Sequence, residues 1–229
     1  MSKYWKSQYD ISAQQNPDSP MKQVGKTVNG KEVGDDQLDV ITSHISKELS
    51  LMSADNMADL GCGNGLLTKR FANVVNTIIG IDFTERFIHY AKEHNDAKNI
   101  RYLHSDLVDL EPDLLREINK LSMHEVLQHL SRIEFTELLK RLALSKQELT
   151  FFVGGIPDQE RIKQFYNSAE KYSFHLKSEE NDRPHLGKWW SENELESLAS
   201  SSGWSFHRIE QPVELYTAYY RFDAIFIKK

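Results

Sequence analysis

The sequence has little cysteine, no long apolar run and no cluster of positive charge. Its 229 residues include one cysteine, Cys62, which excludes an internal disulfide framework and a cysteine-rich metal cluster. The N-terminal stretch MSKYWKSQYD contains no apolar segment of the kind that a signal peptide needs. No stretch approaches the roughly 20 apolar residues that span a bilayer as a helix. These absences predict a cytoplasmic protein without membrane contact.

Positive charge is present but dispersed. The lysines and arginines are scattered along the chain, and the formal net charge is −6. Proteins that bind nucleic acid mainly through phosphates gather positive charge into a patch or stripe. We therefore expect no nucleic-acid partner and favour a small molecule. The sequence leaves open whether the protein is a monomer or a homodimer.

The chain length fits one domain with a small addition. Residues 1–53 contain polar turns such as QQNPDSP and no strong strand pattern, so we expect an N-terminal helical cap or lid with a helix over 36–49. From residue 54 to 229, short apolar runs alternate with amphipathic stretches, the pattern of a parallel sheet with helices on both faces. We expect the segment of about 157–190 to be an inserted lid.

Short apolar runs and capping boxes mark the expected elements. Ser131 with Glu134, and Ser191 with Glu194, have the spacing of a capping box and predict two helix starts; Thr84 is a further candidate N-cap. The expected parallel strands are NMADL (56–60), TIIGID (77–82), IRYLHS (100–105), INKLSMH (118–124) and LTFFVGG (149–155). The last two strand-like stretches, 204–215 and 218–229, have no helix between them and should pair antiparallel at one edge.

A glycine-rich turn follows the first of these strands. In MADLGCGNGLLTKRFA, Gly61, Gly63 and Gly65 stand at alternate positions. Such a turn from strand to helix lets backbone N–H groups approach a ligand at the carboxyl edge of a sheet. The spacing is G-x-G-x-G and not the dinucleotide pattern G-x-G-x-x-G, and the lysine of a P-loop is absent. The turn therefore predicts a nucleotide-like ligand without a pyrophosphate.

Two acids lie where an adenosine would need them. Asp82 ends the second expected strand, where a carboxylate accepts two hydrogen bonds from a ribose diol. Asp106 follows the third strand, where it can accept from an exocyclic amine. Phe83 and Leu107 stand beside these acids and offer apolar faces to a purine ring.

With these motifs in this order, the sequence resembles the class I methyltransferases that use S-adenosylmethionine. ADLGCGNG is similar to their first motif, IIGIDFTERFIHYAKEH to the second-strand acid and following helix, IRYLHSDL to the adenine-side turn, and LSMHEVLQHL to the fourth-strand segment. The resemblance covers roughly residues 54–229. It implies an α/β, Rossmann-like fold: a seven-stranded, mostly parallel sheet with an antiparallel last strand and helices on both faces.

The resemblance also implies a set of cofactor contacts. S-adenosylmethionine, and S-adenosylhomocysteine as its product, would lie across strands one to four. The segment REINKLSM lacks the acid that members often have before the fourth strand, so the start and register of that strand stay open. The expected cofactor-binding residues are Asp59, Gly61, Cys62, Gly63, Gly65, Asp82, Phe83, Asp106, Leu107 and Met123.

Three residues are candidates for catalysis. His124 ends the fourth strand and could take a proton from an acceptor hydroxyl, or it could only line the site. Glu125 could orient His124 or act itself, and His185, in DRPHLGKWW, is the rival base. His129 is expected to be structural. Methyl transfer is an in-line displacement that needs alignment and exclusion of water, so we expect no metal.

The function that these features favour is methyl transfer from S-adenosylmethionine to a hydroxyl or carboxyl oxygen of a small biosynthetic molecule. The N-P-P-Y-type signature of amide and adenine nitrogen methylation is absent from the fourth-strand segment. Two alternatives remain, an N-methyltransferase of a small amine and a catalytically silent, cofactor-binding regulatory protein. A nicotinamide-dependent oxidoreductase would instead have the longer glycine spacing and a proton-relay pair.

Overall fold

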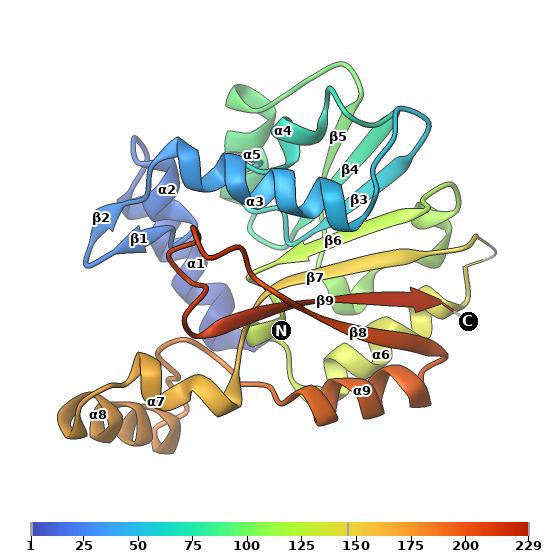
Figure 1. Cartoon of the computed structure of the whole chain (residues 1–229). Helices are drawn as coiled ribbons and strands as arrows, with labels where there is room; N and C mark the ends of the chain where they lie inside the picture. The colour runs from blue at the N-terminus through green and yellow to red at the C-terminus, as the bar shows by residue number, and fades with distance from the viewer. Residues whose placement is uncertain (1, 146, 229) are drawn as a thin grey trace.

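The computed structural model describes residues 2–145 and 147–228 (Figure 1). Its centre is a seven-stranded sheet in the order β5-β4-β3-β6-β7-β9-β8. Strands β5, β4, β3, β6 and β7 are parallel, and β9, the last strand of the chain, runs antiparallel to both of its neighbours. The strands are β3 Asn56–Leu60, β4 Thr77–Asp82, β5 Ile100–His104, β6 Lys120–His124, β7 Thr150–Pro157, β8 Trp204–Glu210 and β9 Arg221–Lys228.

Helices cover both faces of the sheet because successive strand residues point to opposite sides. In β7, Phe151 and Val153 belong to the main core with α6 and α9, whereas Phe152, between them, packs with α3. In the part of the chain that the structure describes, no helix is both long enough and apolar enough to cross a membrane. The larger helices are α1 Lys3–Gln15, α3 Asp35–Glu48, α5 Glu85–His94, α6 Arg132–Ala143, α8 Ala169–Glu180 and α9 Glu192–Ser201.

Most expected element boundaries are confirmed, and three need correction. The two C-terminal strands are shorter than expected, because residues 211–220 form a loop. The N-terminal cap contains a small antiparallel hairpin, β1 Thr27–Val28 with β2 Lys31–Glu32, although we expected no strand there. Thr84 stands at the N-cap of α5, but its hydroxyl makes no capping hydrogen bond.

The open question about the fourth strand is resolved by its pairing. Strand β6 begins at Lys120, which lies opposite Met57 of β3, so Ser122 lies opposite Asp59. This register carries His124 to the carboxyl edge of the sheet, level with Gly154 of β7. The expected capping box at the start of α6 is also complete, since Ser131 and Glu134 each accept from the other's backbone N–H.

The cap lies at the edge of the sheet where the parallel strands end. Figure 1 shows α1, α2 (Pro20–Gln23) and the hairpin on the left, at the carboxyl ends of β6 and β7. Below them, α7 (Ile162–Phe165) and α8 project from the chain that follows β7. These two additions to the sheet border the same edge, which is where ligands bind in open α/β folds. The remaining short elements are α4 Thr68–Phe71 and the 3₁₀ turns Leu107–Asp109, Pro112–Leu115, Leu127–His129 and Gln159–Arg161.

Candidate functional site

A cleft of about 710 Å³ opens at the carboxyl ends of β3, β4 and β6. This volume includes the open mouth of the cleft. The glycine turn forms one wall, and Asp82 and Phe83 after β4 form the next. The N-terminal cap closes the cleft with Tyr9, Val24 and Lys26. A chain segment that is remote in sequence therefore completes the site.

The glycine turn packs closely against neighbouring side chains. Gly61 and Gly63 have positive φ angles of 76° and 54°, which favour glycine. A Cβ on Gly61 would lie 2.4 Å from Cγ2 of Val126, and one on Gly63 would lie 2.9 Å from Cγ1 of Val24. Any larger residue would therefore displace a wall of the cleft.

The backbone donors of this turn correct one expectation. We expected N–H groups of the turn to approach the ligand, but three of them already have partners in the protein. Gly61 and Cys62 both donate to the carbonyl of Ile81, at 2.7 and 3.0 Å, and Gly63 donates to Oδ2 of Asp82 at 3.0 Å. These hydrogen bonds hold the turn against the end of β4.

Asp82 is the buried acid at the centre of the cleft. Its Oδ2 accepts from Gly63 N, and its Oδ1 accepts from Thr84 N at 2.8 Å. Burial disfavours the charged form and raises the pKa of this carboxyl, although the two backbone donors act in the opposite direction. A carboxylate has about four lone-pair positions, so two protein donors leave capacity for ligand hydroxyls.

Eight of the predicted site residues line this cleft, and five do not. Those that line it are Gly61, Cys62, Gly63, Asp82, Phe83, Leu107, His124 and Glu125. The described residues around the cleft do not include Asp59, Gly65, Asp106, Met123 or His185.

The residues outside the cleft have local structural partners. Asp59 accepts a hydrogen bond from Thr68 at 2.6 Å, and burial raises its pKa to about 6. Gly65 makes room for a ring, since a Cβ there would lie 2.6 Å from the hydroxyl of Tyr102. Met123 is fully buried in the main core. These positions correct the expectation that all of the motif residues face the ligand.

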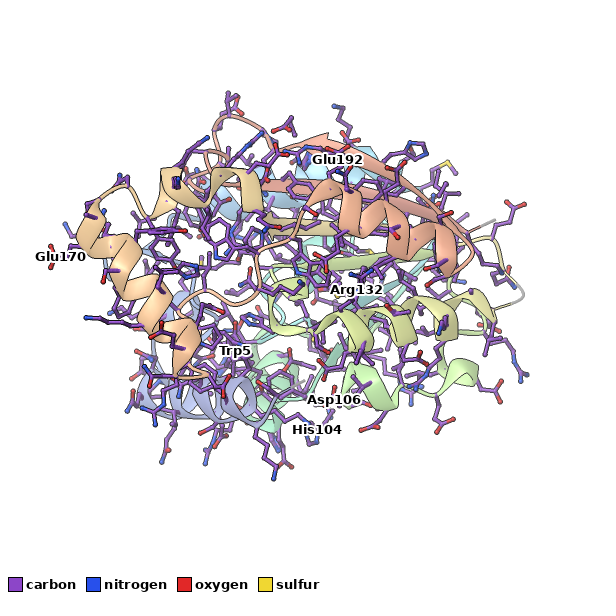
Figure 2. All side chains as sticks on the ribbon, turned by 90° about the horizontal axis from the view of Figure 1, so that it is seen from below. Trp5, His104, Asp106, Arg132, Glu170 and Glu192 are labelled. Carbon is purple, nitrogen blue, oxygen red and sulfur yellow. The ribbon has the colours of Figure 1, made fainter. Side chains whose placement is uncertain are left out.

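Asp106 is occupied by the cap. Its Oδ2 lies 2.6 Å from Nζ of Lys6, and its Oδ1 accepts from the backbone of Val108 at 3.2 Å. Figure 2 shows Trp5, the neighbour of Lys6 in α1, on the same side of the molecule as Asp106. Lys6 therefore competes with any ligand amine for this carboxylate.

A buried ion pair links the cap to the end of β6. Nζ of Lys26 lies 2.8 Å from Oε2 of Glu125, and the two side chains are 6% and 16% exposed. Burial opposes the ionised form of Glu125, but the charge and hydrogen bond of Lys26, together with the charges of His124 and Arg221, outweigh burial and hold the pKa of this carboxyl well below its ordinary value. Glu125 also has a φ of 57°, a conformation that is uncommon for a residue with a side chain. Because its pKa is lowered, the carboxylate of Glu125 is ionised at neutral pH.

His124 is a weaker base than its sequence position suggested. Its Nδ1 lies 3.9 Å from Oε2 of Glu125. Burial, reinforced by the charge of Lys26, lowers its pKa to about 4. The prediction of His124 as a base assumed an ordinary histidine pKa, and the structure corrects that assumption. The imidazole is neutral at pH 7 and can accept a proton, but only with a reduced driving force.

A second cavity shares a wall with the cleft. Its volume is about 1640 Å³ including its open mouth, and four residues line both spaces: Tyr9, Val24, Glu125 and His129. The hydroxyl of Tyr9 lies 2.8 Å from Nε2 of His129, so this pair closes part of the shared wall. His185 lines only the second cavity, where its Nδ1 lies 3.3 Å from the Tyr166 hydroxyl.

Sequence reasoning missed several of these residues. Lys26 and Glu125 are 99 positions apart, and no local pattern marks Lys26 as a site residue. His129 was expected to be structural, yet it lines both spaces, and burial lowers its pKa to about 3. The sequence marks Tyr9 only as one of several aromatic residues in the N-terminal segment that could form part of a lid. Its helix could have been found from the N-cap at Ser2, which accepts from Trp5 N.

Comparison with known proteins agrees with this geometry. The model of a methyltransferase domain matches residues 57–145. The chain is 26% identical over 115 residues to a ubiquinone biosynthesis O-methyltransferase of Pelagibacter ubique, a match that covers 44% of this chain and 47% of that protein. It is 30% identical over 88 residues to the enzyme of the same name from Rhodopseudomonas palustris, covering 38% and 35%. The matches thus span less than half of these relatives' length.

Solved structures share the fold over nearly the whole chain. The DhpI complex with S-adenosylhomocysteine superposes with a TM-score of 0.65 at 14% identity, covering 98% of this chain and 95% of that one. Magnesium protoporphyrin IX methyltransferase of Synechocystis, also with bound S-adenosylhomocysteine, has a TM-score of 0.59 at 16% identity, covering 85% and 83%. The sheet order, the glycine turn and the domain match over residues 57–145 are therefore similar to those of class I S-adenosylmethionine-dependent methyltransferases, and the solved structures share the fold.

Proposed function

We propose that this protein transfers the methyl group of S-adenosylmethionine to an oxygen, hydroxyl or carboxyl, of a small molecule. One observation carries the proposal: the cleft of the glycine turn and Asp82 shares a wall with a second cavity whose lining includes several aromatic rings. A transfer between two bound molecules needs two adjoining spaces whose contents can meet.

The residues of the cleft fit the cofactor. Asp82 offers unfilled acceptor positions to a ribose diol, and Phe83 and Leu107 offer apolar surface to the base. Among the described residues that line the cleft, Asp82 and Glu125 are acidic and Lys26 is basic, a lining that suits a ligand with a positively charged group. When bound, S-adenosylmethionine supplies an electrophilic methyl group on a sulfonium.

The chain's own residues align the acceptor and receive its proton. Glu125 is an ionised group that lines both spaces, so its carboxylate is placed to accept a hydrogen bond from an acceptor hydroxyl. His124 adjoins it and is neutral, so it can take the proton as the methyl is transferred. His185, in the second cavity alone, remains the rival base. A carboxylate acceptor would need neither.

The cap and the segment after β7 are the parts that we assign to acceptor choice. Residues 1–53 close the cofactor cleft through Tyr9, Val24 and Lys26, while residues 157–190 bring Phe165 and His185 to the second cavity. In this proposal, residues 54–229 form the cofactor-binding domain.

The test begins with calorimetric titration of S-adenosylmethionine, S-adenosylhomocysteine and NAD. We expect micromolar binding of the first two, about −8 kcal/mol, and weaker binding of NAD. Release of S-adenosylhomocysteine is then measured with matched phenols, carboxylates and amines. Tighter binding of NAD would overturn the cofactor assignment. Binding of S-adenosylmethionine without turnover on any acceptor would favour the silent regulatory alternative, and turnover on amines alone would favour N-methylation.

A further inference from the structure

A buried arginine lines the second cavity. Arg221 is the first residue of β9 and is only 3% exposed. Its Nη1 donates to the side-chain oxygen of Gln128 and to the carbonyl of Gly155. The guanidinium carbon also lies 5.0 Å from the ring centroid of Tyr220. These contacts fix the plane of the guanidinium at the cavity wall.

This cation lacks a carboxylate partner in the part of the chain that the structure describes. No ion pair there includes Arg221, and its buried Nε has no hydrogen-bond partner. Glu125, the carboxylate that lines the same cavity, contacts Lys26 at 2.8 Å; its charge also acts on Arg221, but the two side chains form no ion pair. Asp223 is also engaged, since its oxygens accept from Gly155 N and Gln211 and contact His44.

A buried charge without a counter-ion in hydrogen-bond contact is costly to the folded protein. An arginine presents five N–H donors in a planar fork that matches the oxygens of a carboxylate or a phosphate-type group. The ring of Tyr220 lies against Arg221, Phe165 packs on Tyr220, and Trp5 and Tyr216 are further aromatic residues of the same cavity. A molecule that satisfies both features has an apolar or aromatic body and an anionic group.

We propose that the methyl acceptor is a small apolar or aromatic acid whose anionic group pairs with Arg221. This inference rests on the proposed function, because it takes the second cavity as the acceptor site. The anionic group would lie at β9, while the oxygen to be methylated faces the wall that Glu125 and Tyr9 share with the cofactor cleft. Arg221 is then a specificity-determining residue.

The experiment measures affinity for three probes of similar shape and different charge. These are 4-hydroxybenzoate, 4-hydroxyphenylphosphonate and the neutral 4-hydroxybenzamide, titrated calorimetrically into the wild-type protein at low chloride, with and without saturating S-adenosylhomocysteine. We expect at least one anion to bind at least about tenfold more tightly than the amide, which is about 1.4 kcal/mol. The stronger anion identifies the group as a carboxylate or a phosphonate. Equal binding of the amide, or no binding of either anion below about 10 mM, overturns the proposal.

Variants separate Arg221 from a general loss of structure. Arg221→Met should abolish the preference for the anion, and Arg221→Lys should retain part of it because the charge remains. Arg208→Met is the matched control: Arg208 is also largely buried, but it pairs with Asp158 at 2.7 Å and stacks on Phe222. The Arg208→Met variant should prefer the anion over the amide to the same extent as wild type. An unchanged preference in Arg221→Met overturns the proposal, and so does its loss in Arg208→Met.

The two proposals fail in different ways. If the anion preference is absent while S-adenosylhomocysteine binds, the acceptor inference is wrong and the proposed function stands. If S-adenosylhomocysteine does not bind at all, the proposed function is wrong, and the probe titrations without it still decide whether Arg221 forms an anion site. Affinity of Arg221→Met for S-adenosylhomocysteine should stay within about threefold of wild type, since the arginine does not line the cofactor cleft.

Discussion

Asp82→Ala should separate cofactor binding from folding more clearly than any other single change. The substitution removes the carboxylate that faces the cleft and the two hydrogen bonds to Gly63 N and Thr84 N. A hydrogen bond to a charged group contributes about 1.5–3 kcal/mol, and the ribose would lose such an acceptor. We expect the affinity for S-adenosylhomocysteine to fall by about 1–3 kcal/mol, roughly 5- to 150-fold.

Asp59→Ala provides the matched control. Asp59 is also a buried acid near the carboxyl edge of the sheet, on the neighbouring strand β3, but its partner is Thr68 and it does not line the cleft. Both substitutions should destabilise the fold, since each leaves buried donors without an acceptor. Only Asp82→Ala should weaken the binding of the cofactor.

The assay is calorimetric titration of S-adenosylhomocysteine into each variant at 25 °C, with urea unfolding to establish the folded fraction. Two results would refute the reasoning. One is an Asp82→Ala protein that is folded and binds within about twofold of wild type. The other is an equal loss of affinity in Asp59→Ala, which would mean that the effect passes through the stability of the turn and not through contact with the ribose.

Three further predictions concern titration, closure and chemistry. Burial lowers the pKa of His129 from 6.5 to about 3. Below pH 6.5, this histidine therefore binds a proton in the unfolded chain but not in the folded chain. The contribution of His129 to the free energy of unfolding is therefore complete above pH 6.5 and falls by about 2 kcal/mol by pH 5. In urea titrations at pH 7 and pH 5, His129→Gln should lose about 2 kcal/mol less stability than wild type over this pH range. Trypsin cleavage within residues 1–35 should slow when S-adenosylhomocysteine is bound, because cap residues line its cleft; unchanged rates would contradict closure. His124→Ala should lower turnover by about two orders of magnitude while cofactor affinity stays within about threefold. Since the pKa of His124 is about 4, the wild-type rate should show no inflection near pH 6.5 from this residue. Loss of turnover in His185→Ala instead would move the base to the second cavity.

Much of the sheet was predictable because its signals are local. The runs NMADL and TIIGID correspond residue for residue to β3 and β4, since short apolar runs bounded by polar turns specify buried parallel strands. The helix start at Ser131 was likewise predictable, because Ser131 and Glu134 have the spacing of a capping box. The place of Asp82 in the cleft was predictable because Asp82 is the acid that ends the second strand, and the topology carries that strand end to the edge of the sheet.

The sequence alone does not show which motif residues line the cleft, because this depends on how the chain folds. Gly63 and Gly65 look alike in sequence, yet the first lines the cleft and the second makes room for the hydroxyl of Tyr102. Which glycine meets a ligand depends on the side chain that a distant strand brings next to it. The same applies to Asp59 and Asp82, two buried acids with different partners.

Tertiary structure alone decided the electrostatics. Lys26 reaches Glu125 across 99 positions, and this contact keeps one carboxyl ionised and helps to hold its neighbour His124 neutral. Arg221 lies buried beside a cavity only because β9 inserts between β7 and β8. A pKa or an unpaired charge depends on burial and on groups within a few ångströms, and both depend on how the cap and the last strand pack on the sheet.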